Sequence, residues 1–327
     1  LMRRSFILLF CFVIALVGCQ KSGPKFSAYE VVDLPIQEEA RCIEVFGDSV
    51  LIGGGKTKGK GYLLQGITSS NDFDIVKSNF KHEVYSLAQH QSRWYVGCDS
   101  VVLYHGDSLH KLNRYWWLER DWVSDLSKHP IWNMASGKKS LTMVAGGKLA
   151  FGVAYNSEDS ARSWEPIEPE NELRAVAKTD DYYETTWIAG NGVFKKRLLD
   201  EFIDFVKWID LDLDNEFITD LYFESDASGW GLTRSGKILS FKSGGSEFEV
   251  KLDGKSAFMN HFDFDENNAI AVGQEGEILF STDGGENWSR FQLDDSIDLN
   301  DVQIINEEAL IVGDGGAFIR IQLSSFQ

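Results

Sequence analysis

Apolar and polar positions along this chain follow one arrangement that recurs from end to end. A short apolar run leads into a turn that contains glycine, and a second apolar run follows, as in "ALIVGDGGAFIRIQL" (309–323) and "AIAVGQEGEILFST" (269–282). Looser copies are "TWIAGNGVFKKRL" (186–198), "GWGLTRSGKILSF" (229–241), "RWYVGCDSVVLYHG" (93–106), "VLIGGGKTKGKGYLLQG" (50–66) and "LTMVAGGKLAFGVAYNS" (141–157). Each copy predicts two strands joined by a tight turn.

A strand of alternating pattern precedes each pair, and a fourth strand such as "NWSRFQL" or "FVKWIDL" follows it. Seven such units over the 309 residues after position 18 give a repeat of about 44 residues. That spacing is typical of β-propeller blades, which have roughly 40–50 residues in four strands. The pattern therefore predicts an all-β fold, a seven-bladed β-propeller of four-stranded antiparallel blades.

The two ends of the repeat predict how the ring closes. The seventh unit shows only three strands before the chain ends, whereas "AYEVVDL" (28–34) stands before the first unit and resembles a fourth strand. We expect this N-terminal strand to complete the last blade, because the pairing removes an open sheet edge. Residues 28–327 would then form a single β-propeller domain, which we expect to be monomeric.

The first residues have the features of an export signal. Arg3 and Arg4 precede an apolar run that is shorter than the roughly 20 residues of a membrane-spanning helix. "LVGC" (16–19) resembles the bacterial lipobox, which implies that residues 1–18 are a lipoprotein signal peptide and that Cys19 carries lipid. Residues 19–27 would be the lipidated tether. Gln20 replaces the aspartate that retains many lipoproteins at an inner membrane, so in a diderm cell the resemblance implies the outer membrane. A plain signal peptide with a chance cysteine is the alternative.

Charge and cysteine content narrow the classes of partner. The net charge of −18 argues against general binding to nucleic acid or anionic lipid, so we expect membrane contact only through the lipid anchor. Two cysteines remain in the mature chain, Cys42 and Cys98; they are a candidate disulfide in an oxidising compartment or two buried thiols. The six histidines show no metal-ligand spacing, and we predict neither a metal nor a cofactor.

The stretch "STDGGENW" has a recognisable structural role. Ser281, Asp283, Gly285 and Trp288 form S-x-D-x-G-x-x-W, which resembles the Asp-box, or BNR repeat, between the third and fourth strands of a blade. The Ser and Asp oxygens accept backbone N–H groups in a tight turn, glycine permits a positive φ, and tryptophan packs between sheets. A second copy has Ser157, Asp159 and Trp164, with Ala161 in place of glycine, which leaves its turn geometry open.

The segment "AVGQEGEILFSTDGGENW" also resembles the photosystem II stability/assembly factor-like propellers, a family that is widespread in non-photosynthetic bacteria. The blade rhythm extends over the mature chain, and the likeness is sharp over 266–293. The resemblance implies a seven-bladed, non-enzymatic scaffold that helps to build or hold a membrane-associated complex. The expected partner is therefore an envelope or membrane protein.

Asp-boxes also occur in sialidases and other glycoside hydrolases, so catalysis is a competing hypothesis. A sialidase needs an arginine triad and an early Arg-Ile-Pro motif, but this chain has "ARCIEVF" in that region. A glycosidase needs only two suitably placed carboxylates, and 50 acidic residues leave that alternative open. A carbohydrate-binding propeller is a further alternative. Two carboxylates that converge near the axis beside an exposed aromatic ring would favour a glycan, and a broad surface would favour a protein.

The longest departure from the repeat is "RYWWLERDWVSDLSKHP" (114–130), in a loop on the face where propellers bind partners. Tryptophan, tyrosine and arginine are favoured interface anchors. A lysine-bearing turn after "VLIGGG" is expected on the same face. The candidate partner-binding residues are Tyr115, Trp116, Trp117, Arg120, Trp122, Lys56, Lys58 and Lys60.

Overall fold

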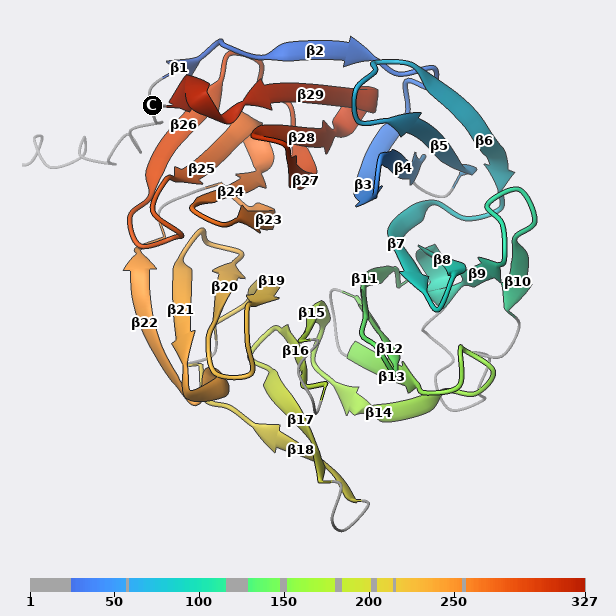
Figure 1. The fold of residues 1–327 in the computed structure, drawn as a ribbon, viewed down its shortest axis with the longest axis vertical. Coiled ribbons are helices and arrows are strands. Elements are labelled where there is room, and N and C mark those ends of the chain that lie inside the picture. Colours follow the sequence, from blue (N-terminus) through green and yellow to red (C-terminus); the bar gives the residue numbers. More distant parts are fainter. Residues whose placement is uncertain are drawn as a thin grey trace, which may run out of the picture.

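The computed structural model describes residues 25–326, except for 57–58, 116–128, 148–151, 180–183, 201–204, 214–215 and 255–256. Seven sheets stand in a ring around one axis (Figure 1), and each blade has the predicted four antiparallel strands. The seven-bladed propeller is therefore confirmed. The predicted signal peptide and Cys19 lie outside the described residues. Within the described ranges, no helix is long and apolar enough to cross a membrane.

Each blade runs from an inner strand at the axis to an outer strand at the rim. The inner strands are β3 (Glu39–Phe46), β7 (Val84–His90), β11 (Ile131–Ser136), β15 (Leu173–Lys178), β19 (Ile218–Phe223), β23 (Met259–Asp265) and β27 (Leu299–Ile305). The second strands are β4 (Ser49–Gly55), β8 (Arg93–Cys98), β12 (Leu141–Gly146), β16 (Thr186–Gly190), β20 (Gly229–Thr233), β24 (Asn268–Gly273) and β28 (Glu308–Gly313).

The third strands are β5 (Gly61–Ile67), β9 (Leu103–Gly106), β13 (Gly152–Ser157), β17 (Phe194–Asp200), β21 (Ile238–Lys242), β25 (Glu277–Ser281) and β29 (Ala317–Gln322). The outer strands are β6 (Phe73–Phe80), β10 (Asn113–Tyr115), β14 (Glu165–Glu170), β18 (Phe205–Asp210), β22 (Glu247–Leu252), β26 (Ser289–Leu293) and, in the seventh blade, β2 (Glu30–Asp33). Short 3-10 turns are η1 (Asp99–Val101), η3 (Ser243–Gly245), η4 (Gln274–Gly276), η5 (Asp314–Gly316) and η6 (Leu323–Phe326).

The position of a strand in its blade explains its hydrophobic pattern. Second and third strands pack against neighbouring blades on both faces, so every residue of β12 and β25 is buried, including the polar residues Thr142, Glu277 and Ser281. Outer strands face solvent on one side, and β22 consists of exposed and half-buried residues, none of them fully buried. Burial of each large aliphatic side chain contributes about 1.5–3 kcal/mol, so the seams between blades hold most of the stability.

The N-terminal segment closes the ring as predicted, and it also contributes a strand that the sequence pattern did not indicate. β2 pairs antiparallel with β29 and completes the seventh blade. Upstream, β1 (Lys25–Phe26) pairs parallel with β26 and adds a fifth strand to the sixth blade. The Phe26 ring stacks on that of Phe326, with centroids 4.6 Å apart and an interplanar angle of 13°. Both ends of the described part of the chain are therefore held against the sixth blade.

Both Asp-box copies form the expected turn between a third and a fourth strand. Ser281 Oγ accepts the N–H of Gly285 at 2.9 Å, and Asp283 Oδ1 accepts the N–H of Asn287 at 2.8 Å. In the third blade, Ser157 Oγ accepts the N–H of Ala161 at 2.8 Å, although Ala161 has a φ of +60°. The departure from glycine therefore leaves the hydrogen bond of the turn in place, at the cost of a strained backbone.

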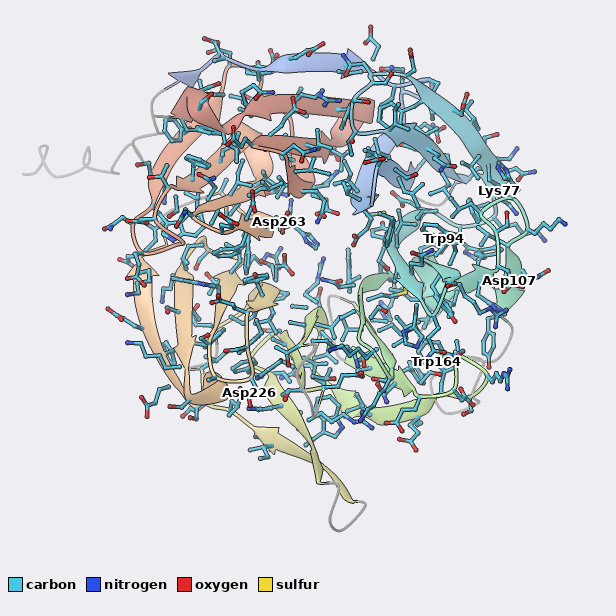
Figure 2. The ribbon with its side chains drawn as sticks, in the orientation of Figure 1. Lys77, Trp94, Asp107, Trp164, Asp226 and Asp263 are labelled. Atoms are coloured by element: carbon cyan, nitrogen blue, oxygen red, sulfur yellow. The ribbon has the colours of Figure 1, made fainter. Side chains whose placement is uncertain are left out.

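Trp164, beside the second Asp-box turn, is buried, and Trp288 beside the first is half-buried (Figure 2 labels Trp164). Trp288 Nε1 donates to Gly285 O at 2.7 Å, and its ring meets that of Phe264 edge-on, with centroids 6.1 Å apart. These contacts give both motifs a structural role.

Candidate functional site

The same irregularity occurs near the start of every inner strand. The pairing between first and second strands shifts by one residue at this point in all seven blades, so one residue per blade is left out of the ladder. Such a bulge redirects the side chain of the extra residue. These seven half-buried residues, called the mouth ring here, are Arg41, Tyr85, Trp132, Arg174, Thr219, Asn260 and Asn300.

One half of the mouth ring is built from aromatic rings and a guanidinium group. Tyr85 and Trp132, on adjacent blades, pack edge to face with centroids 5.1 Å apart. The Arg174 guanidinium lies 3.3 Å from the centre of the Trp132 ring and donates from Nε to Glu172 Oε1 at 2.7 Å. Contacts between guanidinium groups and aromatic rings are worth about 0.5–2 kcal/mol. Three consecutive blades therefore present one continuous stacked surface.

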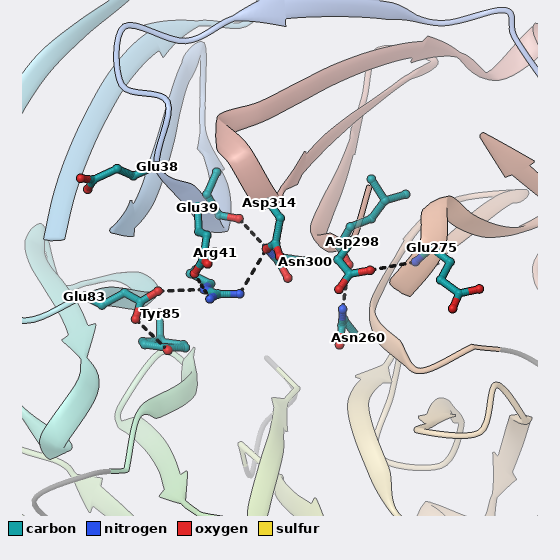
Figure 3. A network of polar contacts seen from close by, with 12 residues as sticks. Glu38, Glu39, Arg41, Glu83, Tyr85, Asn260, Glu275, Asp298, Asn300 and Asp314 are labelled. Atoms are coloured by element: carbon teal, nitrogen blue, oxygen red, sulfur yellow. Dashed lines mark hydrogen bonds and ion pairs between the residues drawn. The ribbon is translucent and has the colours of Figure 1, made fainter. Parts of the chain in front are cut away.

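The other half of the mouth ring is a hydrogen-bonded polar network (Figure 3). Arg41 donates from Nε to Glu83 Oε1 at 2.9 Å, contacts Asp314 Oδ1 at 3.4 Å and pairs with Glu39. Asn300 Nδ2 donates to Asp314 Oδ1 at 2.9 Å. Three blades meet in this network, because Glu83 belongs to the second blade, Arg41 to the first and Asn300 to the seventh.

A third arginine extends the stacked surface toward the sixth blade. The Arg234 guanidinium lies 4.1 Å from the centre of the Phe258 ring and 5.2 Å from that of Phe217. Phe258 is 47 % exposed, one of the few large apolar side chains at the surface of the described chain. An exposed phenylalanine that is braced by an arginine is a suitable contact point for another molecule.

Directly beneath the mouth ring, carboxylates join the inner strands to one another. Asp220 Oδ2 accepts the N–H of Phe262 at 3.2 Å, and Asp301 Oδ2 accepts the N–H of Ile43 at 2.9 Å. His261 lies between these two acids, with Nδ1 3.0 Å from Asp220 and 3.5 Å from Asp301. Both acids therefore bind backbone groups of the next blade, which favours a structural role over acid–base chemistry.

Enclosure by the inner strands changes the proton affinity of these groups. Desolvation alone would lower the pKa of His261, but the Asp220 and Asp301 carboxylates raise it to about 10. Desolvation raises the pKa of Asp301 to about 6 and that of Asp263, which points toward the axis in Figure 2, to about 7. Within the described ranges, no group of three or more His, Cys, Asp or Glu side chains has the arrangement of a metal site.

A second polar cluster lies at the opposite end of the inner strands. Lys178 contacts Ser140 and lies 3.2 Å from Glu184 Oε1, and burial lowers the pKa of Lys178 to about 8. A lysine beside a serine can activate a hydroxyl nucleophile. Here, however, Ser140 is 1 % exposed and the Lys178 side chain 2 % exposed, so a substrate has no access to the pair. The cluster ties the third blade to the fourth.

The structure describes only part of the predicted partner-binding loop. Trp116, Trp117, Arg120, Trp122 and Lys58 lie outside the described residues. Tyr115 ends β10 and donates from its hydroxyl to Arg162 O at 2.9 Å, beside the second Asp-box turn. Lys56 and Lys60 are exposed in the turn between β4 and β5. Because Gly55 pairs with Glu39 at the start of β3, this turn lies at the mouth-ring end of the first blade.

Cys42 and Cys98 are free thiols in the structure, and both are buried in the core between the first and second blades. Burial raises the pKa of both thiols well above the ordinary value. Cys42 lies in the inner strand β3, and Cys98 ends the second strand β8. In this structure the alternative of two buried thiols applies to the pair.

The mouth ring was not among the residues predicted from the sequence, although the sequence contains a signal for it. Aligned at the bulge, the inner strands read "ARCI", "VYSL", "IWNM", "LRAV", "ITDL", "MNHF" and "LNDV". The apolar first and fourth positions recur in all seven, and the second position is the mouth-ring residue. A search of inner strands by blade register, rather than of long loops, would have found these residues.

The comparisons with known proteins agree with this architecture. Residues 201–322, from the outer part of the fourth blade to the last strand, match the family model described as photosynthesis system II assembly factor YCF48. No curated protein sequence matches the chain.

Several solved structures share the fold. A structure described as YCF48 bound to D1 peptide aligns with a TM-score of 0.64 and 13 % identity, over 92 % of this chain and 97 % of that one. YCF48 from Cyanidioschyzon merolae aligns with a TM-score of 0.66 and 14 % identity, over 91 % of this chain and 100 % of that one. The WD40 propeller of Doa1 aligns with a TM-score of 0.68 and 10 % identity, over 91 % of this chain and 98 % of that one. The predicted resemblance to photosystem II assembly-factor propellers is thus confirmed, in sequence over residues 201–322 and in fold over nearly the whole chain.

Proposed function

We propose that this chain is a non-catalytic scaffold of the bacterial envelope that holds a segment of a protein partner across the mouth ring. The observation that carries the proposal is the stacked surface of Tyr85, Trp132 and Arg174 on the second to fourth blades, with the exposed Phe258 at the same end of the sixth blade. Tyrosine, tryptophan and arginine are the residue types most enriched where binding energy concentrates. Side chains from several blades share this surface, so it is broad enough for a peptide segment.

The similar proteins support a protein ligand. One of them, YCF48, has been solved with a D1 peptide, and the family model that matches this chain is that of an assembly factor.

The acids near the axis support a binding role over a catalytic one. Asp220 and Asp301 each accept backbone N–H groups from a neighbouring strand and share His261. A glycosidase needs one carboxylic acid that can donate its proton to the leaving group and one free carboxylate. Two carboxylates that are held as blade-to-blade acceptors fit that requirement poorly.

Lipid on Cys19 would hold the scaffold at a membrane, which we propose to be the outer membrane. Six residue steps separate Cys19 from the start of β1, so the tether spans at most about 20 Å. The sixth and seventh blades would then lie near the lipid surface. Membrane attachment is tested by Cys19→Ser: we expect the variant to lose its lipid label and to leave the membrane fraction. Retention of both would overturn the anchor.

The protein-binding role is tested by photocrosslinking in intact cells. A benzophenone amino acid replaces Phe258 or Glu275 at the mouth-ring end of the sixth blade, and Glu266 or Glu307 in the hairpin turns at the opposite end of the sixth and seventh blades. We expect one protein partner to crosslink from the first pair of positions and not from the second. Equal crosslinking from both ends, or no partner from the mouth-ring end, would overturn the proposal, and recovery of glycan alone would direct attention to carbohydrate binding.

A further inference from the structure

The charges around the mouth ring indicate the chemistry of the partner segment; this inference rests on the function proposed above. The two arginines of the mouth ring, Arg41 and Arg174, are already neutralised within the molecule. Arg41 contacts three carboxylates, those of Glu39, Glu83 and Asp314. Arg174 pairs with Glu172, which is 6 % exposed. Neither guanidinium therefore presents an uncompensated positive charge to a ligand.

The carboxylates exceed the cations on one side of the ring (Figure 3). Five of them, called the acidic arc here, come from the first, sixth and seventh blades: Glu38, Glu39, Glu275, Asp298 and Asp314. Arg41 is the cation among them. Glu38 and Glu275 are exposed, and neither makes an ion pair with any residue that the structure describes.

The acidic arc adjoins the exposed apolar surface of Phe258. The N–H of Gln274 donates to Phe258 O at 2.8 Å, so the phenylalanine directly adjoins the turn that carries Glu275. The N–H of Glu275 in turn donates to Asp298 Oδ1 at 2.9 Å. Arg234 covers one side of the Phe258 ring, which still leaves 47 % of the residue exposed. One apolar contact point thus lies at the end of a row of negative charges.

We infer that the partner segment is basic where it crosses the sixth and seventh blades, with lysine or arginine side chains next to an apolar one. The cations would face the acidic arc and the apolar side chain would pack on Phe258. Complementary charge of this kind steers association and excludes partners of the wrong sign. An acidic segment would meet the net negative charge of the arc, since Arg41 is the one cation of the described residues set against its five carboxylates. A second copy of this chain is disfavoured as the occupant by its own net charge of −18. Lys56 and Lys60 lie on the more peripheral β4–β5 turn and mark the outer limit of the arc on the first blade.

The inference is tested by fluorescence anisotropy with the purified protein and three labelled peptides. Each is a short Gly/Ser chain with two inserted pairs: Lys–Leu in the first, Glu–Leu in the second and Gln–Leu in the third. We expect the Lys–Leu peptide to bind most tightly and its affinity to fall steeply with added salt. The double variant Glu38→Gln/Glu275→Gln should bind this peptide about fivefold more weakly. The matched control Glu266→Gln/Glu307→Gln changes the same number of charges at the opposite end and should leave binding unchanged.

Phe258→Ala supplies an independent readout, since it removes the apolar contact without a change of charge, and should weaken the Lys–Leu peptide about tenfold. Preference for the Glu–Leu peptide, equal effects of the two double variants, or no binding of any peptide would each overturn the inference. The crosslinking experiment can succeed in all three cases, because it reports that a partner occupies this face and not what charge the partner carries. Failure of the inference is therefore distinguishable from failure of the proposed function.

Discussion

The guanidinium of Arg174 lies 3.3 Å from the centre of the Trp132 ring, and the two residues occupy the same bulged position in adjacent blades. Trp132 also donates from Nε1 to Gly146 O at 2.7 Å. Residues that are 42 positions apart in the chain thus form one rigid contact at the mouth ring. The bulge makes this contact possible, because it turns both side chains out of the ladder.

Trp132→Leu should lower the free energy of unfolding by about 2–3 kcal/mol, because it removes both the cation–π contact and the indole hydrogen bond. Urea unfolding measures the difference. Trp94→Leu is the matched control at the opposite end of the second blade, where the ring meets Phe46 edge-on at 4.8 Å and no arginine of the described ranges stacks on it. A cost for Trp132→Leu no greater than that of the control would show that the Arg174 stack adds nothing.

Phe26→Ala should lower the free energy of unfolding, because it weakens the attachment of the N-terminal segment to the sixth blade. The residue is 6 % exposed and contacts both Phe326 and Phe291, so truncation should cost about 3 kcal/mol. Phe326→Ala should cost a similar amount, and the double variant less than the sum, because the two rings contact each other. The exposed Phe258 is the control, since its truncation should change stability by less than about 0.5 kcal/mol. Additive effects of Phe26 and Phe326 would contradict the stack.

Substitutions at the same position of the two Asp-box turns should have opposite effects on stability. Ala161→Gly should stabilise the protein by roughly 0.5 kcal/mol, since glycine adopts the φ of +60° without the strain that alanine has there. Gly285→Ala should be strongly destabilising, because the added Cβ would lie 2.9 Å from the Trp230 ring and the φ is +91°. Thermal unfolding of both variants measures the shifts. A destabilised Ala161→Gly protein would mean that the alanine makes a contact worth more than the strain.

The cluster at the axis predicts lower stability as the pH rises. The folded-state pKa values of Asp263 and Asp301, about 7 and about 6, lie above the ordinary aspartate value of 3.8, and that of His261, about 10, lies above 6.5. Groups whose pKa is raised by folding stabilise the protein fully below the unfolded pKa and lose that contribution as the pH passes the folded value. Their joint contribution should therefore fall between about pH 4 and pH 10.

Asp263→Asn isolates one part of this effect. The amide oxygen can still accept the N–H of Ile304, which Asp263 Oδ2 now accepts at 2.6 Å, but the side chain no longer titrates. Urea unfolding at pH 5, 7 and 9 should show that the free energy of unfolding falls less with rising pH in the variant than in the wild type, by on the order of 2 kcal/mol. The contribution of Lys178 to stability changes with pH in the opposite direction, because its lowered pKa of about 8 makes stability fall as the pH drops. This contribution is the same in the variant and in the wild type, so it does not affect the comparison. Parallel pH profiles would rule out Asp263 as a source of the dependence.

Local and periodic features were readable from the sequence. The Gly-turn repeat predicted seven blades, and "AYEVVDL" predicted the strand that closes the last one, because strand patterning and turn chemistry depend on near neighbours in the chain. The Asp-box residues were predictable for the same reason: Ser281, Asp283 and Gly285 form their hydrogen bonds within one turn. The short parallel strand β1 was not predicted, since two residues carry no pattern.

The position of the candidate site depended on contacts that no local pattern contains. Sequence reasoning favoured the long aromatic loop at 114–130, whereas the ring closure brings Arg41, Tyr85, Trp132 and Arg174 together from four blades. The sequence by itself determined the class of fold and the number of blades, through periodicity. Only the tertiary structure decided which side chains face one another and which arginines are neutralised, because both depend on distances across the ring between residues that are far apart in the chain.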